Sequence, residues 1–298
     1  MYQPIKLGET SAIVDEKGYD IDVGEDHPYD EGLYTVGEIA EKIHGLESIT
    51  SRHFDFFKEN GYLAVGNVFS EKEVCDAIDG FRYLATGGNP DYKGASFERA
   101  VKGKVDSLSG DARMDALRKL SWFVDHDSRL HAMAFKPEVI GILKKMLGGG
   151  EPQLFQDMAL SKPPGGGREK PWHQDHAYFN FPLDARIVGM WIALDPATVD
   201  NGCMHILPGK HREPVVHFKR RDWQICDTEI LGQSATAVPL QPGGVLFFDG
   251  KLPHGTPENK TADRRRALQF HYYPDGTEKW RNADRMAVFG AEGKDVTC

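Results

Sequence analysis

The chain has 298 residues, of which 40% are hydrophobic and 27% are charged, and its formal net charge is −9 at pH 7. This composition is ordinary for a globular protein, and the acidic balance argues against nucleic acid as the main partner because phosphate neutralisation needs a basic surface. No apolar run reaches the ~18 residues that a membrane-spanning helix needs, so we expect no membrane partner.

The four cysteines are scattered through the chain and form no C-x-x-C pair. We therefore expect free thiols in a reducing compartment. The first residues, MYQPIK, lack the basic region and apolar stretch of a signal peptide. Together these features favour a cytoplasmic protein, and they leave its oligomeric state undefined.

Residues 1–34 are acidic and contain several glycines and prolines, which predicts an irregular N-terminal arm. Residues 35–298 are expected to form one domain, in which 35–150 give mostly helical support. Ser70, followed three residues later by Glu73, is the capping-box pattern that begins a helix. Helices are expected over 35–46, 51–60, 70–84, 111–126 and 136–147.

From residue 151 the pattern changes to short runs of β-branched and aromatic residues, separated by turns that contain glycine and proline. Strands are expected over 153–160, 186–194, 203–207, 235–240, 245–248 and 265–273. Short strands at this spacing are typical of an antiparallel sandwich or jelly roll. We therefore expect a mixed α+β fold with a mainly β core over 151–275.

The stretch PWHQDHAYF, residues 171–179, carries the strongest chemical signal. Residues two apart on a β-strand project from the same face, so His173 and Asp175 are expected to point at a common centre. The best partner for this pair is His254, in the later segment LPHG. Two histidines and one carboxylate form the facial triad that holds Fe(II) and leaves coordination positions open. Arg265 follows His254 by 11 residues, at the start of an expected strand.

With these residues assembled, the chain resembles the phytanoyl-CoA dioxygenase family of Fe(II)/2-oxoglutarate oxygenases. The resemblance covers about residues 150–275, and the helical first half matches in layout only. Besides the residues above, it rests on the segments WIALD (191–195), NGCMHILPGKH (201–211) and PGGVLFF (242–248). It implies a double-stranded β-helix, or jelly roll, with buttressing helices from the N-terminal half. It also implies that His173, Asp175 and His254 bind iron and that Arg265 anchors 2-oxoglutarate.

The chemistry of the residues agrees with these implied roles. A chelating 2-oxo acid and O2 fill the three positions that a facial triad leaves open, and a planar guanidinium binds the distal carboxylate in a bidentate manner. Arg264 and Arg266 compete for that role, but strand alternation turns them away from the face that Arg265 occupies. Two further residues, Trp191 and Gln156, are candidates for the cosubstrate pocket. The simpler interpretation of Trp191 is a core aromatic, and that of Gln156 is a solvated amide.

Other polar residues near these motifs are expected to have structural or surface roles. His176 is expected to turn away from the metal and to line the pocket or support the ligands. The spacing of His205, His211 and His217 also invites a metal-binding interpretation, but no ligand is expected at His205 or His211, which lie in a segment that carries the resemblance. The basic run 219–221 is typical of a solvated loop, and the surrounding segment 210–235 is long enough to be a lid over the site.

The expected function is therefore an Fe(II)/2-oxoglutarate-dependent dioxygenase. It would hydroxylate a C–H bond of a soluble small molecule with O2 and release succinate and CO2. The alternative within the family is an acyl-CoA 2-hydroxylase of the phytanoyl-CoA type. Two alternatives from other classes are a zinc-dependent hydrolase, which would leave Arg265 without a role, and a non-catalytic metal-binding jelly-roll protein, against which the intact triad argues.

Overall fold

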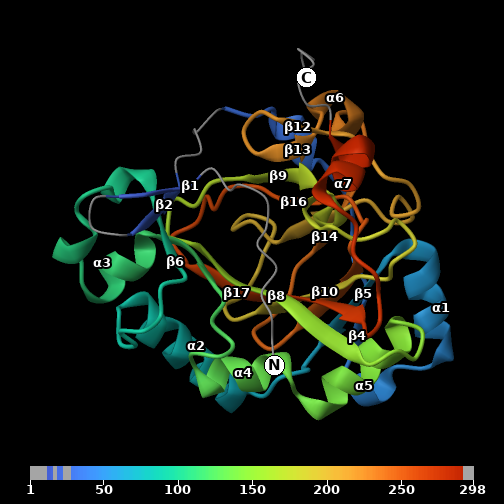
Figure 1. Ribbon diagram of the computed structural model, residues 1–298, viewed down its shortest axis with the longest axis horizontal. Coiled ribbons are helices and arrows are strands. Elements are labelled where there is room, and N and C mark those ends of the chain that lie inside the picture. Colours follow the sequence, from blue (N-terminus) through green and yellow to red (C-terminus); the bar gives the residue numbers. More distant parts are fainter. Residues whose placement is uncertain (1–11, 16–18, 23–27, 291–298) are drawn as a thin grey trace.

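Two β-sheets packed face to face form the centre of the molecule (Figure 1). The computed structural model describes residues 12–15, 19–22 and 28–290. In hydrogen-bonded order, the major sheet contains β1 (Ala12–Val14), β2 (Asp20–Asp22), β6 (Ala95–Glu98), β7 (Leu117–Ser121), β8 (Pro152–Lys162), β17 (Arg265–Pro274), β10 (Val188–Ala193), β15 (Val245–Asp249), β5 (Tyr62–Gly66) and β4 (Lys42–His44). The minor sheet contains β3 (Val36–Ile39), β14 (Ala235–Val238), β11 (Met204–Ile206), β16 (His254–Thr256) and β9 (Lys170–His173).

Strand alternation separates the two faces of the major sheet. Along β10, Met190 and Ile192 belong to the core on the helix side, whereas Trp191 and Ala193 belong to the core between the sheets. All four side chains are fully buried. A strand that is buried on both faces reads as a continuous apolar run, which is why this segment is apolar throughout.

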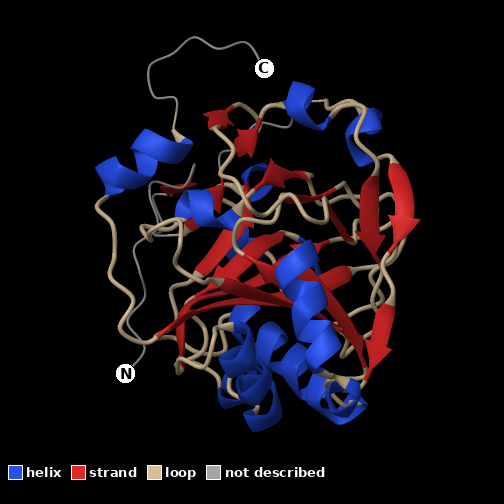
Figure 2. Cartoon of the chain, turned by 90° about the vertical axis from the view of Figure 1, so that its right-hand side faces the viewer, coloured by secondary structure: helices blue, strands red, loops and turns tan. Residues whose placement is uncertain are grey.

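Helices from the first half of the chain cover the outer face of the major sheet, on the lower side of Figure 1 and in the lower half of Figure 2. They are α1 (Ser51–Asn60), α2 (Glu71–Ala85), α4 (Ser128–Ala134) and α5 (Pro137–Met146). The predicted capping box begins α2, with the Ser70 hydroxyl accepting from the Glu73 amide. The smaller helices are α3 (Gly110–Asp115), α6 (Asp227–Ile230) and α7 (Asn282–Phe289). The 3-10 turns are η1 (Glu31–Tyr34), η2 (Leu46–Ser48), η3 (Arg99–Val101), η4 (Val105–Ser107) and η5 (Asp175–Tyr178).

The mixed fold with a jelly-roll core and buttressing helices is confirmed, but two predicted helices are wrong. Residues 35–46 form β3, β4 and η2, because β3 pairs with β14 and β4 pairs with β5 as parallel edge strands. Residues 111–126 form α3 and then β7. The pairing of β7 with β6 skips Arg118, so Leu117 and Leu120 both reach the core although they are three residues apart. Such a bulge gives a strand the apolar spacing of a helix.

The first half of the chain therefore contributes strands as well as helices to the fold. Described parts of the expected arm form β1 and β2, which extend the edge of the major sheet, and η1. Residues 1–11, 16–18 and 23–27 of the arm lie outside the described residues. The division into an arm and one domain stays a prediction. Among the described residues, no helix has the length and apolar character to cross a membrane.

Candidate metal and cosubstrate site

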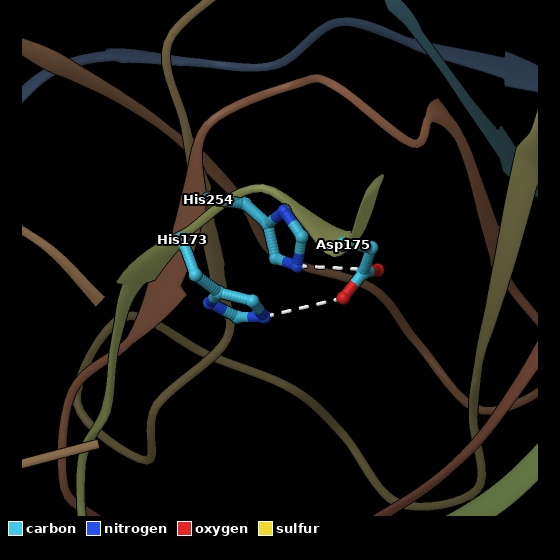
Figure 3. Close-up of side chains that lie close together, drawn as sticks. All are labelled: His173, Asp175 and His254. Carbon is cyan, nitrogen blue, oxygen red and sulfur yellow. Dashed lines mark ion pairs between the residues drawn. The ribbon is translucent and has the colours of Figure 1, made fainter. Parts of the chain in front are cut away.

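The minor sheet brings the predicted triad together. His173 ends β9 and His254 begins β16, and the two residues are paired in register. His173 Nε2 lies 3.3 Å from Asp175 Oδ1, and His254 Nε2 lies 3.6 Å from Asp175 Oδ2. Figure 3 shows both imidazole rings directing these nitrogens at the carboxylate. One ligand atom from each residue lies within 4.8 Å of the others, which is the arrangement of a three-ligand metal site.

The geometric reason that we gave for the pair His173 and Asp175 is only partly right. β9 ends at His173, and Asp175 opens the 3-10 turn η5 after the extended residue Gln174. The two side chains therefore converge across a strand end, and not from one face of a continuous strand. The His176 amide donates to the Gly250 carbonyl at 2.7 Å, which holds this turn against the loop before His254.

Hydrogen bonds to backbone carbonyls set the tautomers of both histidines. The Nδ1 atom of His173 lies 2.7 Å from the Pro171 carbonyl, and that of His254 lies 2.9 Å from the Leu252 carbonyl. A carbonyl oxygen only accepts, so each Nδ1 carries the hydrogen and donates it. Both Nε2 lone pairs are then free, and they face the shared centre, as metal-binding imidazoles require.

Burial sets the charge state of the site. His173, Asp175 and His254 are 4%, 5% and 2% exposed, respectively. Burial, and then the neighbouring His173 ring, lower the pKa of His254 to about 3. Burial alone would raise the pKa of Asp175, but nearby histidines and their hydrogen bonds hold that pKa well below its usual value. A neutral His254 imidazole beside an ionised Asp175 carboxylate belongs to the donor set that suits Fe(II).

Arg265 is a buried cation whose polar atoms are incompletely satisfied. The residue is 2% exposed, and its Nε and Nη1 atoms have no hydrogen-bond partner among the described residues. Burial lowers the pKa of this guanidinium to about 10. A charge in such a place is costly unless an anion pairs with it. These orphaned donors fit the distal carboxylate of 2-oxoglutarate.

The two neighbouring arginines are already paired with carboxylates. Arg264 Nε donates to Asp115 Oδ1 at 2.6 Å, and Arg266 donates to both Asp195 oxygens at 2.7 Å. Of the three arginines, Arg265 alone points into the space between the sheets, as strand alternation predicts. The geometry therefore favours it over its neighbours as the cosubstrate anchor.

Trp191 and Gln156, the other two cosubstrate candidates, also lie in the interior. Trp191 is fully buried, its Nε1 has no partner among the described residues, and its ring centre is 5.6 Å from the Arg265 guanidinium carbon. Gln156 is 3% exposed, with its Oε1 unpartnered in the described part of the chain. The alternative interpretation of Gln156 as a solvated amide is therefore wrong.

Several residues that sequence reasoning missed support the site. His271 Nε2 lies 2.7 Å and Gln269 Nε2 lies 3.2 Å from Asp175 Oδ2. Both stand on β17 at even spacing from Arg265, so strand periodicity would have placed them on the inner face. The Lys162 ammonium, opposite Arg265 in register, is buried and donates to the carbonyls of Arg168 and Pro257 at 2.7 and 2.5 Å.

The other histidines near the site have contacts outside the triad. His176 turns away from the triad, and its Nε2 lies 3.2 Å from the Phe181 carbonyl. No described metal-binding group includes His205, His211 or His217. His217 nevertheless has a structural role, because its Nε2 accepts the amide hydrogen of Gln174, the residue between two triad members, at 2.9 Å.

The segment 210–235, expected to be a lid, is held in place by buried ion pairs. It forms the hairpin β12 (His217–Lys219) and β13 (Trp223–Ile225), and β13 packs beside β9. The Arg221 side chain is only 5% exposed and forms ion pairs with Glu169 at 2.7 Å and Asp227 at 2.6 Å. The prediction that 219–221 is wholly solvated is therefore wrong for Arg221, because charge pairing overrides its polarity.

Comparison with known proteins identifies the class to which this fold and site belong. With 27% identity and a TM-score of 0.59, the chain is similar to EvdO2 of Micromonospora carbonacea var. aurantiaca, solved in complex with 2-oxoglutarate. The match covers 81% of this chain and 97% of that one. The fold is also that of iron-bound EctD from S. alaskensis, at a TM-score of 0.62 and 22% identity, over 78% and 80% of the two chains. The protein is an Fe(II)- and 2-oxoglutarate-dependent dioxygenase.

Within that class the family is defined by sequence. Residues 57–267 match the phytanoyl-CoA dioxygenase (PhyH) family, and the chain belongs to it. A probable phytanoyl-CoA dioxygenase of Caenorhabditis elegans is 26% identical over 246 residues, 77% of each chain. The resemblance drawn from the motifs alone is thereby confirmed.

Proposed function

We propose that this dioxygenase hydroxylates a C–H bond of a small molecule, with Fe(II) bound by His173, Asp175 and His254 and 2-oxoglutarate anchored by Arg265. One observation carries the proposal. A buried guanidinium with two unpartnered nitrogens lies in the same interior as a ready-made ligand triad. The unpartnered guanidinium is not expected in a protein that binds no anion there, because it leaves buried polar atoms unsatisfied.

The chain's own residues bind and orient the reactants. Arg265 would hold the distal carboxylate while Trp191 packs beside its guanidinium. Between Arg265 and Gln269 on the inner face stands only Ala267, which faces Ala193 in register. Both of these alanine side chains are short, so they place little bulk on this face between Arg265 and Gln269. When bound, the iron with 2-oxoglutarate and O2 supplies the oxidation that converts C–H to C–OH, with succinate and CO2 as coproducts.

The side of the site beyond His271 is apolar. The ring centres of Phe155 and Phe179 lie 6.0 and 5.0 Å from that of His271, and Phe181 packs against Phe155. Aromatic walls hold a carbon skeleton and exclude water from it, which C–H oxidation requires. They suit a substrate with an apolar reactive portion.

A free small molecule is favoured over a CoA thioester as the substrate. The net charge of −9 gives no general attraction to a polyanionic tail. Arg221, the most buried cation of the expected lid, is already neutralised by Glu169 and Asp227. The curated relatives carry the name of an acyl-CoA oxygenase, so the thioester remains the competing substrate class.

The deciding experiment measures turnover with matched pairs of free acids and their CoA thioesters. Purified protein is supplied with Fe(II), 2-oxoglutarate and O2, and both succinate and a product heavier by one oxygen are quantified. His254→Ala is the control, since loss of a ligand should abolish both signals. Product from free acids supports the proposal, whereas product seen only with thioesters would assign the chain to the acyl-CoA hydroxylases.

The alternative from another class, a zinc hydrolase, gives the orphaned guanidinium of Arg265 nothing to bind.

We place the protein in a reducing compartment, the cytoplasm, because the described cysteines are free thiols. Cys298 lies outside the described residues. Fractionation of cells that express the tagged chain tests this location, and recovery in an oxidising compartment would contradict it.

A further inference from the structure

The carboxylate of Asp175 is approached differently at its two oxygens. Oδ1 faces the His173 Nε2 atom at 3.3 Å. Oδ2 lies 2.7 Å from His271 Nε2 and accepts from the Gln269 amide at 3.2 Å, whereas the triad residue His254 approaches it only to 3.6 Å. Both of these nitrogen donors come from β17, the strand that begins with Arg265.

The hydrogen of His271 is assigned by its surroundings. An ionised carboxylate only accepts, so Nε2 carries the hydrogen and donates it. The other nitrogen, Nδ1, has no partner among the described residues and lies in a fully buried ring. That ring is flanked by Phe155, Phe179 and Phe248, which offer no acceptor. His271 is thus held in one tautomer, with its donor aimed at Asp175.

Two donors on one oxygen determine how a carboxylate binds a metal. A carboxylate that used both oxygens would occupy one more coordination position than one that used a single oxygen. The triad must leave three positions for a chelating oxo acid and O2. Hydrogen bonds engage the lone pairs of Oδ2, so they favour coordination through Oδ1 alone.

We propose that Gln269 and His271 are positioning residues that hold Oδ2 of Asp175, so that this ligand presents only Oδ1 to the metal. This inference rests on the proposed metal site and adds residues to it. It also places the cosubstrate anchor and the ligand supports on one strand face. A single register of β17 therefore sets both halves of the site.

The test uses Co(II) as the probe, under anaerobic conditions, in four variants of the full chain. His271→Leu and Gln269→Leu remove one donor each. His271→Gln keeps an N–H donor at about the reach of Nε2. His205→Leu is the control, because His205 is equally buried with an unpartnered Nε2 but belongs to the outer face of the minor sheet, beside Tyr34.

Both donor-removing variants should bind Co(II) about 10- to 100-fold more weakly, the usual effect of losing a support to a metal ligand. Their Co(II) visible spectra should also change, because the carboxylate is free to chelate. His271→Gln should recover most of the affinity, and His205→Leu should bind like the wild type. Circular dichroism of each variant checks that it is folded. If His271→Leu does not fold, Gln269→Leu still tests the proposal.

The outcomes separate this inference from the function on which it rests. If the wild type fails to bind Co(II), the proposed metal site itself is wrong. If the wild type binds and both leucine variants match it in affinity and spectrum, the positioning role is overturned while the metal site stands. An equal loss in His205→Leu would overturn it too, because a general loss of packing would then account for the effect.

Discussion

The guanidinium carbon of Arg265 lies 5.6 Å from the ring centre of Trp191, and both side chains are buried between the sheets. The indole face offsets part of the cost of burying the cation without neutralising its charge. The guanidinium is therefore held in place, with Nε and Nη1 available for an anion. Arg264 and Arg266 are instead paired with carboxylates, so substitution of each arginine in turn should have different effects on 2-oxoglutarate binding.

We predict that Arg265→Ala raises the 2-oxoglutarate requirement about 100-fold or more, because an unpaired buried carboxylate costs ~3–5 kcal/mol. Arg264→Ala and Arg266→Ala remove ion pairs with Asp115 and Asp195 that do not face the triad, and they should change the requirement less than about threefold. The measurement is succinate formation against 2-oxoglutarate concentration. A large effect at either neighbour, with none at Arg265, would show that the anchor is assigned to the wrong residue.

Replacing Trp191 tests whether its ring orients that anchor. A desolvated cation–π contact is worth up to ~2 kcal/mol, so Trp191→Leu should raise the 2-oxoglutarate requirement by about 10- to 30-fold. Trp191→Phe keeps a ring face and should have a smaller effect. Anaerobic titration of the Fe(II)-loaded protein with 2-oxoglutarate measures this directly. Equal affinities in the two variants would mean that an aromatic face at this position does not contribute to 2-oxoglutarate binding.

The residues that bind could be predicted from sequence because short motifs carry them. His173, Asp175, His254 and Arg265 are recognisable by type and order, and the turns around them are marked by glycine and proline. Their supports were missed for a different reason. Gln269 and His271 stand in an apolar strand, and only the even spacing from Arg265 indicates that they face the interior.

The errors in secondary structure have tertiary causes. Leu117 and Leu120 show helical spacing, but a bulge opposite β6 makes that spacing compatible with a strand. Val36–Ile39 is largely exposed and has no strand alternation, so only its pairing with β14 makes it a strand. Neither the bulge nor the pairing partner can be inferred from local sequence.

The buried ion pairs of Arg221 should contribute to stability rather than to cosubstrate binding. Arg221→Met would leave Glu169 without its cation and Asp227 with only Arg220, 3.8 Å away, and an uncompensated buried charge costs ~3–5 kcal/mol. Glu169→Gln in the same chain removes one of the stranded charges and should restore part of the loss. Urea unfolding of both variants measures the effect. A single variant as stable as the wild type would show that the hairpin is not held by these charges.

The last prediction concerns His217, which links the β12–β13 hairpin to the turn between two triad residues. Its Nδ1–H donates to the Val215 carbonyl at 2.7 Å, so its Nε2 must accept from the Gln174 amide at 2.9 Å. Protonation of Nε2 would place two donors against each other. Burial first, and then the nearby His173, Lys170 and His254, lower the pKa of His217 from 6.5 to about 3.

A histidine whose folded pKa is lowered stabilises the fold above its unfolded pKa, and this stability is lost as pH falls from about 6.5 towards 3. Between pH 7.5 and 5, His217 should thus account for a loss of about 2 kcal/mol in the free energy of unfolding. His217→Gln keeps an acceptor for Gln174 but takes up no proton. Its free energy of unfolding, measured with a chelator present, should therefore fall by about 2 kcal/mol less than that of the wild type over the same range. The donor–acceptor geometry argues that His217 cannot be charged within the fold. Identical pH dependence in the two proteins would contradict this.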